Sequence, residues 1–389
     1  MNNPVLIESC ELEPINATCF IRRQDPAAIP HLLSEAANTA DPADLFMKMF
    51  YIFGAYGQDA TALQMQSKAL EFRKLFRIVA PQTPQLKLLA LVAAGDMMDN
   101  APLDFLIENS DVQLELLYVD EHLRLPLKVP EHDVMYLALG ESPKNNPILQ
   151  SLSELVKHWP RPTVNDPLGI GRCARDVFGQ LMRTAPNVRV ANTLISKHTD
   201  LAYAGAPFTL RPVGSHAGRG FVKINSHQEL SEYISSYKED QCFYRAEFLE
   251  YQSEDGLYRK YRIALISGVP YICHLAISEN WMVHYFPSGM ELSQSKRDEE
   301  EREMNHFDAG FAKNHAKAFA YIYSALGLDY VVLDCAQTQT GELLVFEADS
   351  GAWVHATDPV EIFPYKRPVM QKVFLAFREM LTRKAQSVH

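Results

Sequence analysis

The chain of 389 residues lacks the cysteine pattern of a disulfide-stabilised or zinc-binding protein. Its six cysteines are scattered, and no two of them are spaced as Cys-x-x-Cys. That spacing is typical of zinc sites and of redox-active pairs. We therefore expect reduced thiols and a cytoplasmic protein.

Positive charge and long apolar runs are also scarce. The chain has 37 Lys and Arg against 48 Asp and Glu, a net charge of -11, whereas a nucleic-acid-binding surface needs an excess of basic residues. The longest apolar run, LKLLALVAAG, is too short to span a bilayer. The start, MNNPVLIESCELEP, lacks the basic and apolar regions of a signal peptide. We expect neither a nucleic-acid nor a membrane partner, and the oligomeric state is left open.

Two common nucleotide-binding motifs are absent as well. The sequence contains no Walker A loop and no GxGxxG fingerprint, which excludes the usual nucleotide-fold interpretations. What is present is the composition of an ordinary globular protein, 47% hydrophobic and 22% charged. A chain of this length has room for two or three domains.

The pattern of apolar residues changes twice along the chain. Residues 1–83 show helical spacing, which predicts two or three amphipathic helices that form a packing or docking unit. Residues 84–160 contain the short apolar runs QLKLLALVAAG, DVQLELLYVD and HDVMYLALGES, which predict a small parallel αβ layer. The helix-like ILQSLSELVKHW and the proline-rich linker PRPTVNDP follow.

The remainder, residues 161–389, is predicted to be rich in strands. FTLRPV and FVKIN indicate two strands joined by the loop GSHAGRG, and a capping box of Ser226 and Glu229 opens the next helix. CFYRAEFLEY, YRKYRIALISG and PYICHLAIS indicate three more strands. A long helical stretch is expected over about 295–326, followed by a hairpin with the turn QTGE and a closing helix. The fold class is therefore α/β, with α+β lobes in this last part.

Three carboxylates mark the predicted hairpin. Glu347 and Asp349 lie two residues apart on a strand, so they point to the same face at about 7 Å spacing. Pairing across the turn brings Asp334 to the same cluster. Three carboxylates so close repel one another unless a cation holds them, and Mg²⁺ suits oxygen ligands. The alternative is a solvated hairpin end without a ligand.

The loop LRPVGSHAGRG supplies groups that suit phosphate. Its three glycines, Gly214, Gly218 and Gly220, allow backbone amides to approach phosphate oxygens closely. Arg211 stands at its entrance as a permanent cation. The alternative is an ordinary connection between two strands.

In their order, these elements resemble the ATP-grasp family, in the branch related to the ribosomal-protein glutamate ligase. The motifs that carry the resemblance are PTVNDPLGIGRCARD, LRPVGSHAGRG, RAEFLEY, RKYRIALISG and LDYVVLDCAQTQTGELLVFEAD. The resemblance implies an ATP-grasp domain over 161–389, with a smaller lobe at about 205–250. It also implies a pre-ATP-grasp domain over 84–160 behind an N-terminal helical segment.

This resemblance implies an ATP- and Mg²⁺-dependent ligase that joins a carboxylate to an amine of an amino acid or peptide through an acyl phosphate. The N-terminal helices would then serve a peptide or protein partner. The alternatives are a nucleotide-binding scaffold without activity and a phosphotransferase. The implied catalytic residues are Arg211 and Arg262, and the implied metal ligands are Asp334, Glu347 and Asp349. The implied ATP-binding residues are Arg175, Arg211, Gly214, Ser215, His216, Gly218, Gly220, Glu247, Phe248, Leu249 and Glu250.

Four positions depart from the family pattern. The segment RCARD lacks a lysine that the family usually has, which leaves Arg172 or Arg175 as the second phosphate cation. Arg211 replaces a usual lysine, and Asp349 replaces a common asparagine. Lys260 stands where an acidic residue is expected, two residues before Arg262. The change at Lys260 indicates an atypical acceptor pocket, whereas the three carboxylates favour an active enzyme.

Overall fold

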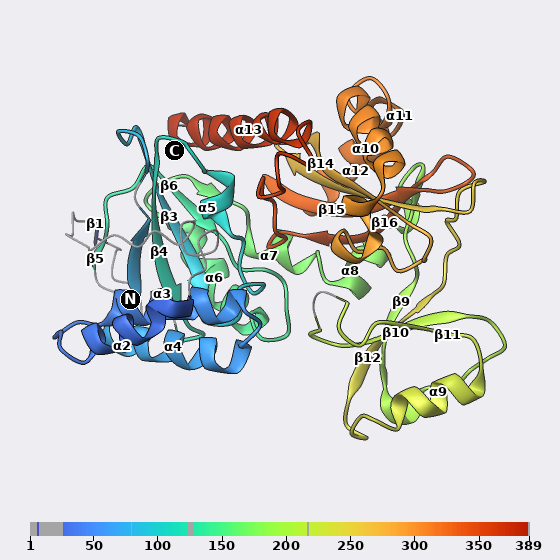
Figure 1. Ribbon diagram of the computed structural model, residues 1–389, viewed down its shortest axis with the longest axis horizontal. Helices are drawn as coiled ribbons and strands as arrows, with labels where there is room; N and C mark the ends of the chain where they lie inside the picture. Colours follow the sequence, from blue (N-terminus) through green and yellow to red (C-terminus); the bar gives the residue numbers. More distant parts are fainter. Residues whose placement is uncertain (1–5, 8–25, 79, 123–127, 216–217, 388–389) are drawn as a thin grey trace.

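The computed structural model describes residues 6–7, 26–78, 80–122, 128–215 and 218–387. Figure 1 shows an N-terminal layer of helices and strands beside a C-terminal unit that contains two separate sheets. The short strands β1 (Leu6–Ile7) and β5 (Lys128–Val129) pair in parallel next to the N-terminal layer.

The N-terminal sheet has the strand order β2-β4-β3-β6-β7. Its strands are β2 (Leu75–Ile78), β3 (Leu86–Ala93), β4 (Val112–Val119), β6 (Val134–Leu137) and β7 (Thr163–Val164). The pairs β3–β4, β3–β6 and β6–β7 are parallel, which confirms the predicted parallel layer.

Two local predictions in this layer were wrong. Strand β2 lies in the segment predicted to be helical and runs antiparallel to β4. Four residues directly after a helix are too few to show a period of two. The proline-rich segment is not a simple linker, because it contains β7. Next to β7, Asn165 exchanges hydrogen bonds with the backbone of Tyr330, at 3.1 and 3.0 Å.

Helices cover both faces of the N-terminal sheet. They are α2 (Ile29–Ala36), α3 (Ala43–Ala55), α4 (Asp59–Phe72), α5 (Leu103–Leu106) and α6 (Asn146–Lys157). Alternate residues of β3 point to opposite faces, so Leu88 packs in the same core as Phe50 of α3, whereas Leu89 packs with Leu152 of α6. Burial on both faces explains why β3 is apolar nearly throughout.

The smaller C-terminal sheet is antiparallel, with the order β11-β10-β12-β9. Its elements are β9 (Thr193–Lys197), β10 (Phe208–Pro212), β11 (Val222–Ile224), α9 (His227–Ile234) and β12 (Cys242–Glu247). The predicted strands on either side of the glycine loop are confirmed. So is the helix cap, since Ser226 Oγ accepts a hydrogen bond from the Glu229 amide at 3.1 Å.

The larger C-terminal sheet has the order β14-β13-β15-β16-β8. Its strands are β8 (Val188–Arg189), β13 (Tyr258–Ile266), β14 (Val269–Ser278), β15 (Tyr330–Gln337) and β16 (Leu343–Asp349). The predicted β15–β16 hairpin is confirmed. The stretch predicted as one long helix is divided into three helices, which break near Gly310. The helices of this unit are α7 (Pro167–Gly171), α8 (Arg175–Leu181), α10 (Gln294–His306), α11 (Phe311–Asn314), α12 (Ala316–Leu326) and α13 (Lys366–Gln386), with 3-10 turns at Met182–Thr184, His198–Asp200, Phe286–Ser288 and Met290–Leu292. A further 3-10 turn, Pro26–Ala28, precedes α2 in the N-terminal layer.

Helix α13 joins the N-terminal layer to the larger sheet (Figure 1). Its fully buried Phe377 ring lies 5.9 Å from the Tyr136 ring of β6 and 5.3 Å from the Tyr330 ring of β15. The bidentate ion pair of Arg378 with Asp111 adds a polar contact between α13 and the loop before β4. One core therefore spans both units.

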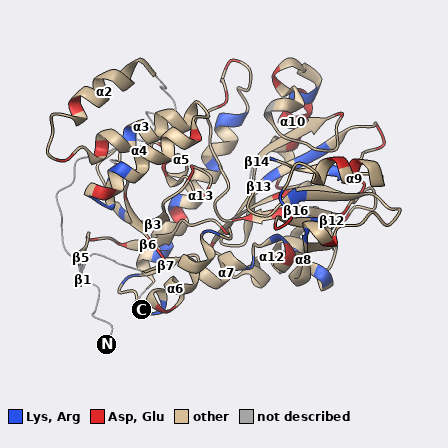
Figure 2. Ribbon diagram, turned by 90° about the horizontal axis from the view of Figure 1, so that it is seen from below, with Lys and Arg blue, Asp and Glu red and all other residues tan. Residues whose placement is uncertain are grey.

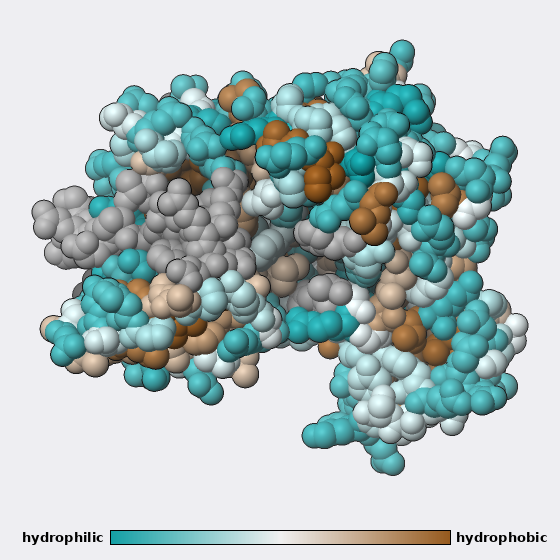
Figure 3. Space-filling model, in the orientation of Figure 1, coloured by the Kyte–Doolittle hydropathy of each residue, from teal (hydrophilic) through white to brown (hydrophobic). Residues whose placement is uncertain are grey.

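The surface is polar and carries both signs of charge. Figure 2 shows acidic and basic residues interspersed over both units, and Figure 3 shows a mainly hydrophilic face with small apolar patches. Among the helices that the structure describes, none combines the length and the apolar character needed to cross a bilayer.

Candidate functional site

A cleft of about 250 Å³ lies between the two C-terminal sheets. Its walls come from β10 and β12 of the smaller sheet and from β13, β15 and β16 of the larger one. It contains most of the predicted site residues, namely Arg175, Arg211, Gly218, Glu247, Phe248, Leu249, Arg262, Asp334, Glu347 and Asp349.

A larger hollow of about 1250 Å³ lies elsewhere, between α13 and the loop that follows α5. It contains none of the predicted site residues. We place the functional site in the smaller cleft because buried charges of both signs converge there. The volume of a cavity does not indicate its chemistry. Burial of charged side chains costs free energy unless they are paired or bind a ligand, so their presence marks a candidate site.

The hairpin brings the three predicted carboxylates to one wall of the cleft. Asp334 of β15 lies directly opposite Glu347 of β16, and a bulge next to this pair shifts the register. Asp349 follows two residues later on the same face. Within the described residues, however, no group of three acidic, histidine or cysteine side chains is arranged to hold a metal ion. The metal set therefore stays a prediction.

Asp334 is neutralised by two basic side chains from β13. Its Oδ1 accepts a hydrogen bond from Arg262 Nε at 2.8 Å, and its Oδ2 accepts from Arg262 Nη2 and Lys260 Nζ, both at 3.0 Å. Burial alone would raise the pKa of Asp334, but Arg262 and Lys260 outweigh it and hold the pKa well below its usual range. Asp334 is thus a fixed anion with its charge already matched.

Glu347 is paired with Arg175, at the first turn of α8. Arg175 Nη2 contacts Glu347 Oε2. Burial opposes ionisation of Glu347, yet Arg175 and Arg211 keep its pKa below the usual value. Burial and the nearby Arg175 in turn lower the pKa of Arg211 to about 10, so Arg211 stays charged at neutral pH.

Asp349 has different surroundings. Its Oδ1 accepts a hydrogen bond from the Gly351 amide at 2.7 Å, and no basic side chain in the described part of the chain forms an ion pair with it. Burial and the neighbouring Glu347 raise the pKa of Asp349. A cation bound to Glu347 and Asp349 would relieve this repulsion, so these two residues fit a metal ion.

The glycine loop depends on backbone conformations that glycine adopts easily. Gly214, Gly218 and Gly220 have φ angles of 79°, 72° and 66°. Ser215 lies between Arg211 and the loop, with its Oγ 3.3 Å from Arg211 Nε. Gly214 and Ser215 line a small adjoining pocket with Glu347 and Asp349, whereas Gly220 packs against Pro212 and Tyr237. The predicted site residue His216 lies outside the described residues.

An apolar slot adjoins the charged wall. Leu249, Phe346 and Trp281 belong to one apolar cluster with Leu344, and all four line the cleft. Glu247, Phe248 and Leu249, predicted to contact a nucleobase, lie there as well. Glu250 is not among the lining residues. Its Oε1 instead accepts hydrogen bonds from the amides of Tyr251 and Gln252, at 3.0 and 3.1 Å.

Two functional candidates were missed from the sequence. Lys260 had been noted only as a departure, although it lies two residues before Arg262 and so shares its face of β13. His284 lines the cleft, and a Cβ added to Gly218 would lie 2.5 Å from its Nε2. Burial and Lys260 lower the pKa of His284, so it is neutral at pH 7. The sequence did not predict the approach of His284 to the glycine loop, because the two segments are distant along the chain.

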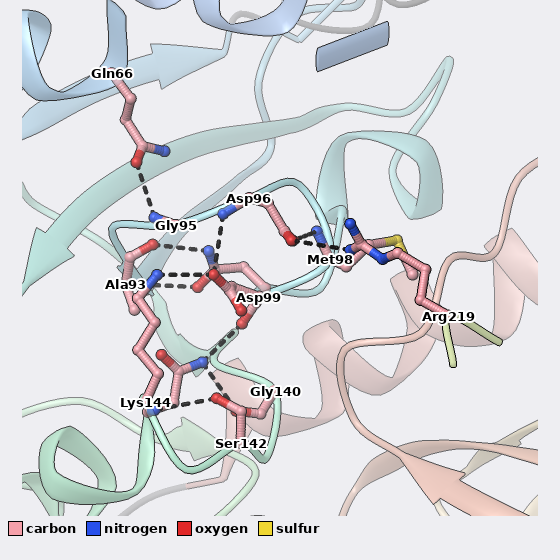
Figure 4. Close-up of polar contacts among 12 residues, drawn as sticks. Gln66, Ala93, Gly95, Asp96, Met98, Asp99, Gly140, Ser142, Lys144 and Arg219 are labelled. Carbon is pink, nitrogen blue, oxygen red and sulfur yellow. Dashed lines mark hydrogen bonds and ion pairs between the residues drawn. The ribbon is translucent and has the colours of Figure 1, made fainter. Parts of the chain in front are cut away.

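The loop after β3 reaches the cleft at Met98, and Figure 4 shows the polar contacts of this loop. Asp99 Oδ2 accepts hydrogen bonds from the Asp96 amide at 3.0 Å and from Lys144 Nζ at 2.9 Å, and Asn145 links Asp99 O to Gly140 O. Arg219 of the glycine loop reaches Asp96 at 3.7 Å (Figure 4). This rigid loop lies at the carboxyl end of a parallel strand, where α/β sheets commonly bind ligands.

No protein-family model and no curated protein matches the chain. Among solved structures, the chain is similar to D-alanine–D-alanine ligase from Bacillus anthracis complexed with ATP, with a TM-score of 0.46 and 12% identity over 78% of this chain and 99% of that one. It is similar to a RimK-domain ATP-grasp protein from Sphaerobacter thermophilus, with a TM-score of 0.46 and 12% identity over 76% and 99%. It is also similar to the VanG D-Ala:D-Ser ligase from Enterococcus faecalis, with a TM-score of 0.44 and 14% identity over 78% and 98%. One of these structures is described as an ATP-grasp protein, and the likeness of all three to this chain is distant.

Proposed function

We propose that the protein is an ATP-dependent carboxylate–amine ligase, which forms an amide or peptide bond through an acyl phosphate. The observation that carries the proposal is the make-up of one cleft. It combines an apolar slot with buried carboxylates and arginines, beside a glycine loop. An apolar slot suits a nucleobase, and fixed cations suit phosphates.

The basic side chains of the cleft have separate tasks in this proposal. Arg175 and Arg211 bind phosphate oxygens, while amides of the glycine loop cover them. Arg262 is held by two hydrogen bonds to Asp334 and by a third from its Nη1 to the Trp353 carbonyl at 3.1 Å. It is therefore preorganised to stabilise charge that develops during phosphoryl transfer.

Glu347 and Asp349 are the residues that would hold magnesium, whereas Asp334, the third ligand implied by the resemblance, is already paired with Arg262 and Lys260. When bound, the ion would screen the repulsion between the phosphates and the substrate carboxylate. The chain itself contributes the positioning of the two anions, which is the main requirement of this chemistry.

The reaction consists of two displacements. A carboxylate oxygen of the substrate attacks the terminal phosphorus, and ADP leaves with the electron pair of the broken bond. The amine nitrogen of an amino acid or peptide then attacks the acyl carbon, inorganic phosphate leaves, and the nitrogen loses a proton. We retain a peptide or protein partner at the N-terminal helices as part of the proposal, since Leu63 and Phe72 are exposed there.

A screen of ADP release against amino acids and peptides, with mass spectrometry of the products, tests the proposal. A ligase yields ADP together with an amide, and a product that carries a stable phosphoester would indicate a phosphotransferase instead. The second candidate function is a nucleotide-binding scaffold without catalytic activity. Basic side chains already form ion pairs with Asp334 and Glu347, so neither carboxylate needs a metal ion to balance its charge. Nucleotide binding without ADP release from any acceptor would favour that candidate.

A further inference from the structure

We propose that Lys260 serves as a built-in cation at Asp334, so that the cleft holds one divalent ion, on Glu347 and Asp349, and not two. This inference rests on the proposed function, because it concerns the metal content of the same site. It assigns a role to the lysine that replaces the expected acidic residue.

The geometry gives Asp334 little capacity for a metal ion. An ionised carboxylate has about four acceptor positions, and Arg262 and Lys260 occupy three of them, at 2.8, 3.0 and 3.0 Å. The side chains of Asp334 and Lys260 are only 3% and 13% exposed. A metal ion at Asp334 would place a further positive charge beside two buried cations, which is unfavourable.

Glu347 and Asp349 differ from Asp334 in how many of their carboxylate oxygens are already paired. Arg175 contacts only one oxygen of Glu347, Oε2. Asp349 has an amide donor at Oδ1 and no basic ion-pair partner among the described residues. Glu347 and Asp349 therefore retain acceptor oxygens on one face of β16, whereas Asp334 does not.

Manganese binding tests the inference without any substrate. Free Mn²⁺ is measured by electron paramagnetic resonance while the protein is titrated in the presence of AMP-PNP, an ATP analogue that is not hydrolysed. We expect one Mn²⁺ per chain for the wild type and two for Lys260→Met, which keeps the apolar stem but removes the charge. Lys260→Gln, which keeps a donor for Asp334, is a second variant with the same expectation.

The control is Lys74→Met, which breaks a lysine–aspartate pair of 2.8 Å with Asp120, a pair that does not line the cleft. The Lys74→Met variant should bind one Mn²⁺ per chain, as the wild type does. Two ions in the wild type, or one ion in both folded Lys260 variants, would overturn the inference and leave the ligase proposal standing. If calorimetry shows that the wild type binds neither AMP-PNP nor the ion, the proposed function fails as well.

Discussion

Asp334 lies within β15 and Asp349 ends the neighbouring strand β16, yet their carboxylates have opposite surroundings. Arg262 and Lys260 hold the pKa of Asp334 well below its usual range despite burial. Burial and Glu347 raise the pKa of Asp349. Asp334 is thus a fixed partner for Arg262. Asp349 is an anion that has no basic ion-pair partner among the described residues and is suited to a metal ion.

Glu347→Gln should abolish ADP formation, by a factor of about a thousand or roughly 4 kcal/mol of barrier. The amide keeps the size of the side chain but loses the charge that faces Arg175 and the metal. Asp349→Asn should preserve much of the activity, because it restores the residue common in the family that the sequence resembles. Steady-state ADP release at saturating ATP measures both, and thermal denaturation checks the fold. Equal, near-wild-type rates in the two variants would remove the metal assignment.

His132 makes the stability of the N-terminal layer depend on pH. Trp159 Nε1 can only donate, so His132 Nε2 accepts this bond at 2.9 Å and the Nδ1 proton is donated to the Pro130 carbonyl at 2.8 Å. Burial lowers the pKa of His132 in the folded protein. A histidine in the unfolded chain titrates at about 6.5, so the unfolded state takes up this proton first. The stability is therefore present above about pH 6.5 and is lost as the pH falls toward the folded-state pKa.

Denaturant unfolding at about pH 7.5 and 5.5 measures this effect. The wild type should lose stability at the lower pH, and His132→Gln should lose less, although it starts from a lower value. Replacing the exposed His227 by Gln should leave the difference between the two pH values unchanged. An equal pH dependence in wild type and His132→Gln would exclude His132 as the cause.

At the scale of elements, the glycine loop is a motif that can be recognised in the sequence and that lies at the cleft. Gly218→Ala would place a Cβ 2.5 Å from His284 Nε2 at a φ of 72°, so the histidine must move within the cleft. We expect about tenfold weaker binding of AMP-PNP, equivalent to about 1.4 kcal/mol. Titration calorimetry measures the affinity.

The matched control is Gly341→Ala in the turn of the β15–β16 hairpin. Gly341 has a φ of 84°, but an added Cβ there has no neighbour within 4 Å. This variant carries the same backbone strain without the contact to His284, so its affinity for AMP-PNP should equal that of the wild type. If both variants bind equally well, the close approach of the loop to His284 has no role in nucleotide binding.

The elements that could be predicted from the sequence are those with strong local signals. The β15–β16 hairpin follows from two apolar runs and the turn QTGE, and the cap at Ser226 follows from a short motif. Strand β2 could not be separated from the preceding helix, because four residues show no clear period. The break near Gly310 was missed, because an isolated glycine is tolerated within a helix and does not by itself mark a helix end.

Much of the site could be predicted, but its ion pairs could not. Alternation along β13 and β16 places Arg262, Glu347 and Asp349 on one side, and the register of the hairpin adds Asp334. The contact of Lys260 with Asp334 depends on the register of β13 and β15, two strands that are distant in sequence. The loop after β3 reaches the cleft at Met98 only through tertiary packing.

At the scale of the whole molecule, α13 holds the two units together. Phe377 is fully buried between Tyr136 of the N-terminal sheet and Tyr330 of the larger sheet. Phe377→Ala should lower the free energy of unfolding by about 3–5 kcal/mol, because it leaves a cavity at this junction. Leu375→Ala on the same helix should change it by less than about 0.5 kcal/mol, since Leu375 is 63% exposed. Urea denaturation of both variants decides the point, and equal stabilities would contradict the bridging role.

The central claim is that the cleft between the two C-terminal sheets binds ATP through magnesium and fixed cations. Titration calorimetry with AMP-PNP, with and without Mg²⁺, tests it most directly. We predict binding in the presence of Mg²⁺ that is lost when a chelator is added, and a stabilisation of about 2.7 kcal/mol at a hundredfold excess over the dissociation constant. Absence of binding, or equal affinity with and without the chelator, would contradict the account.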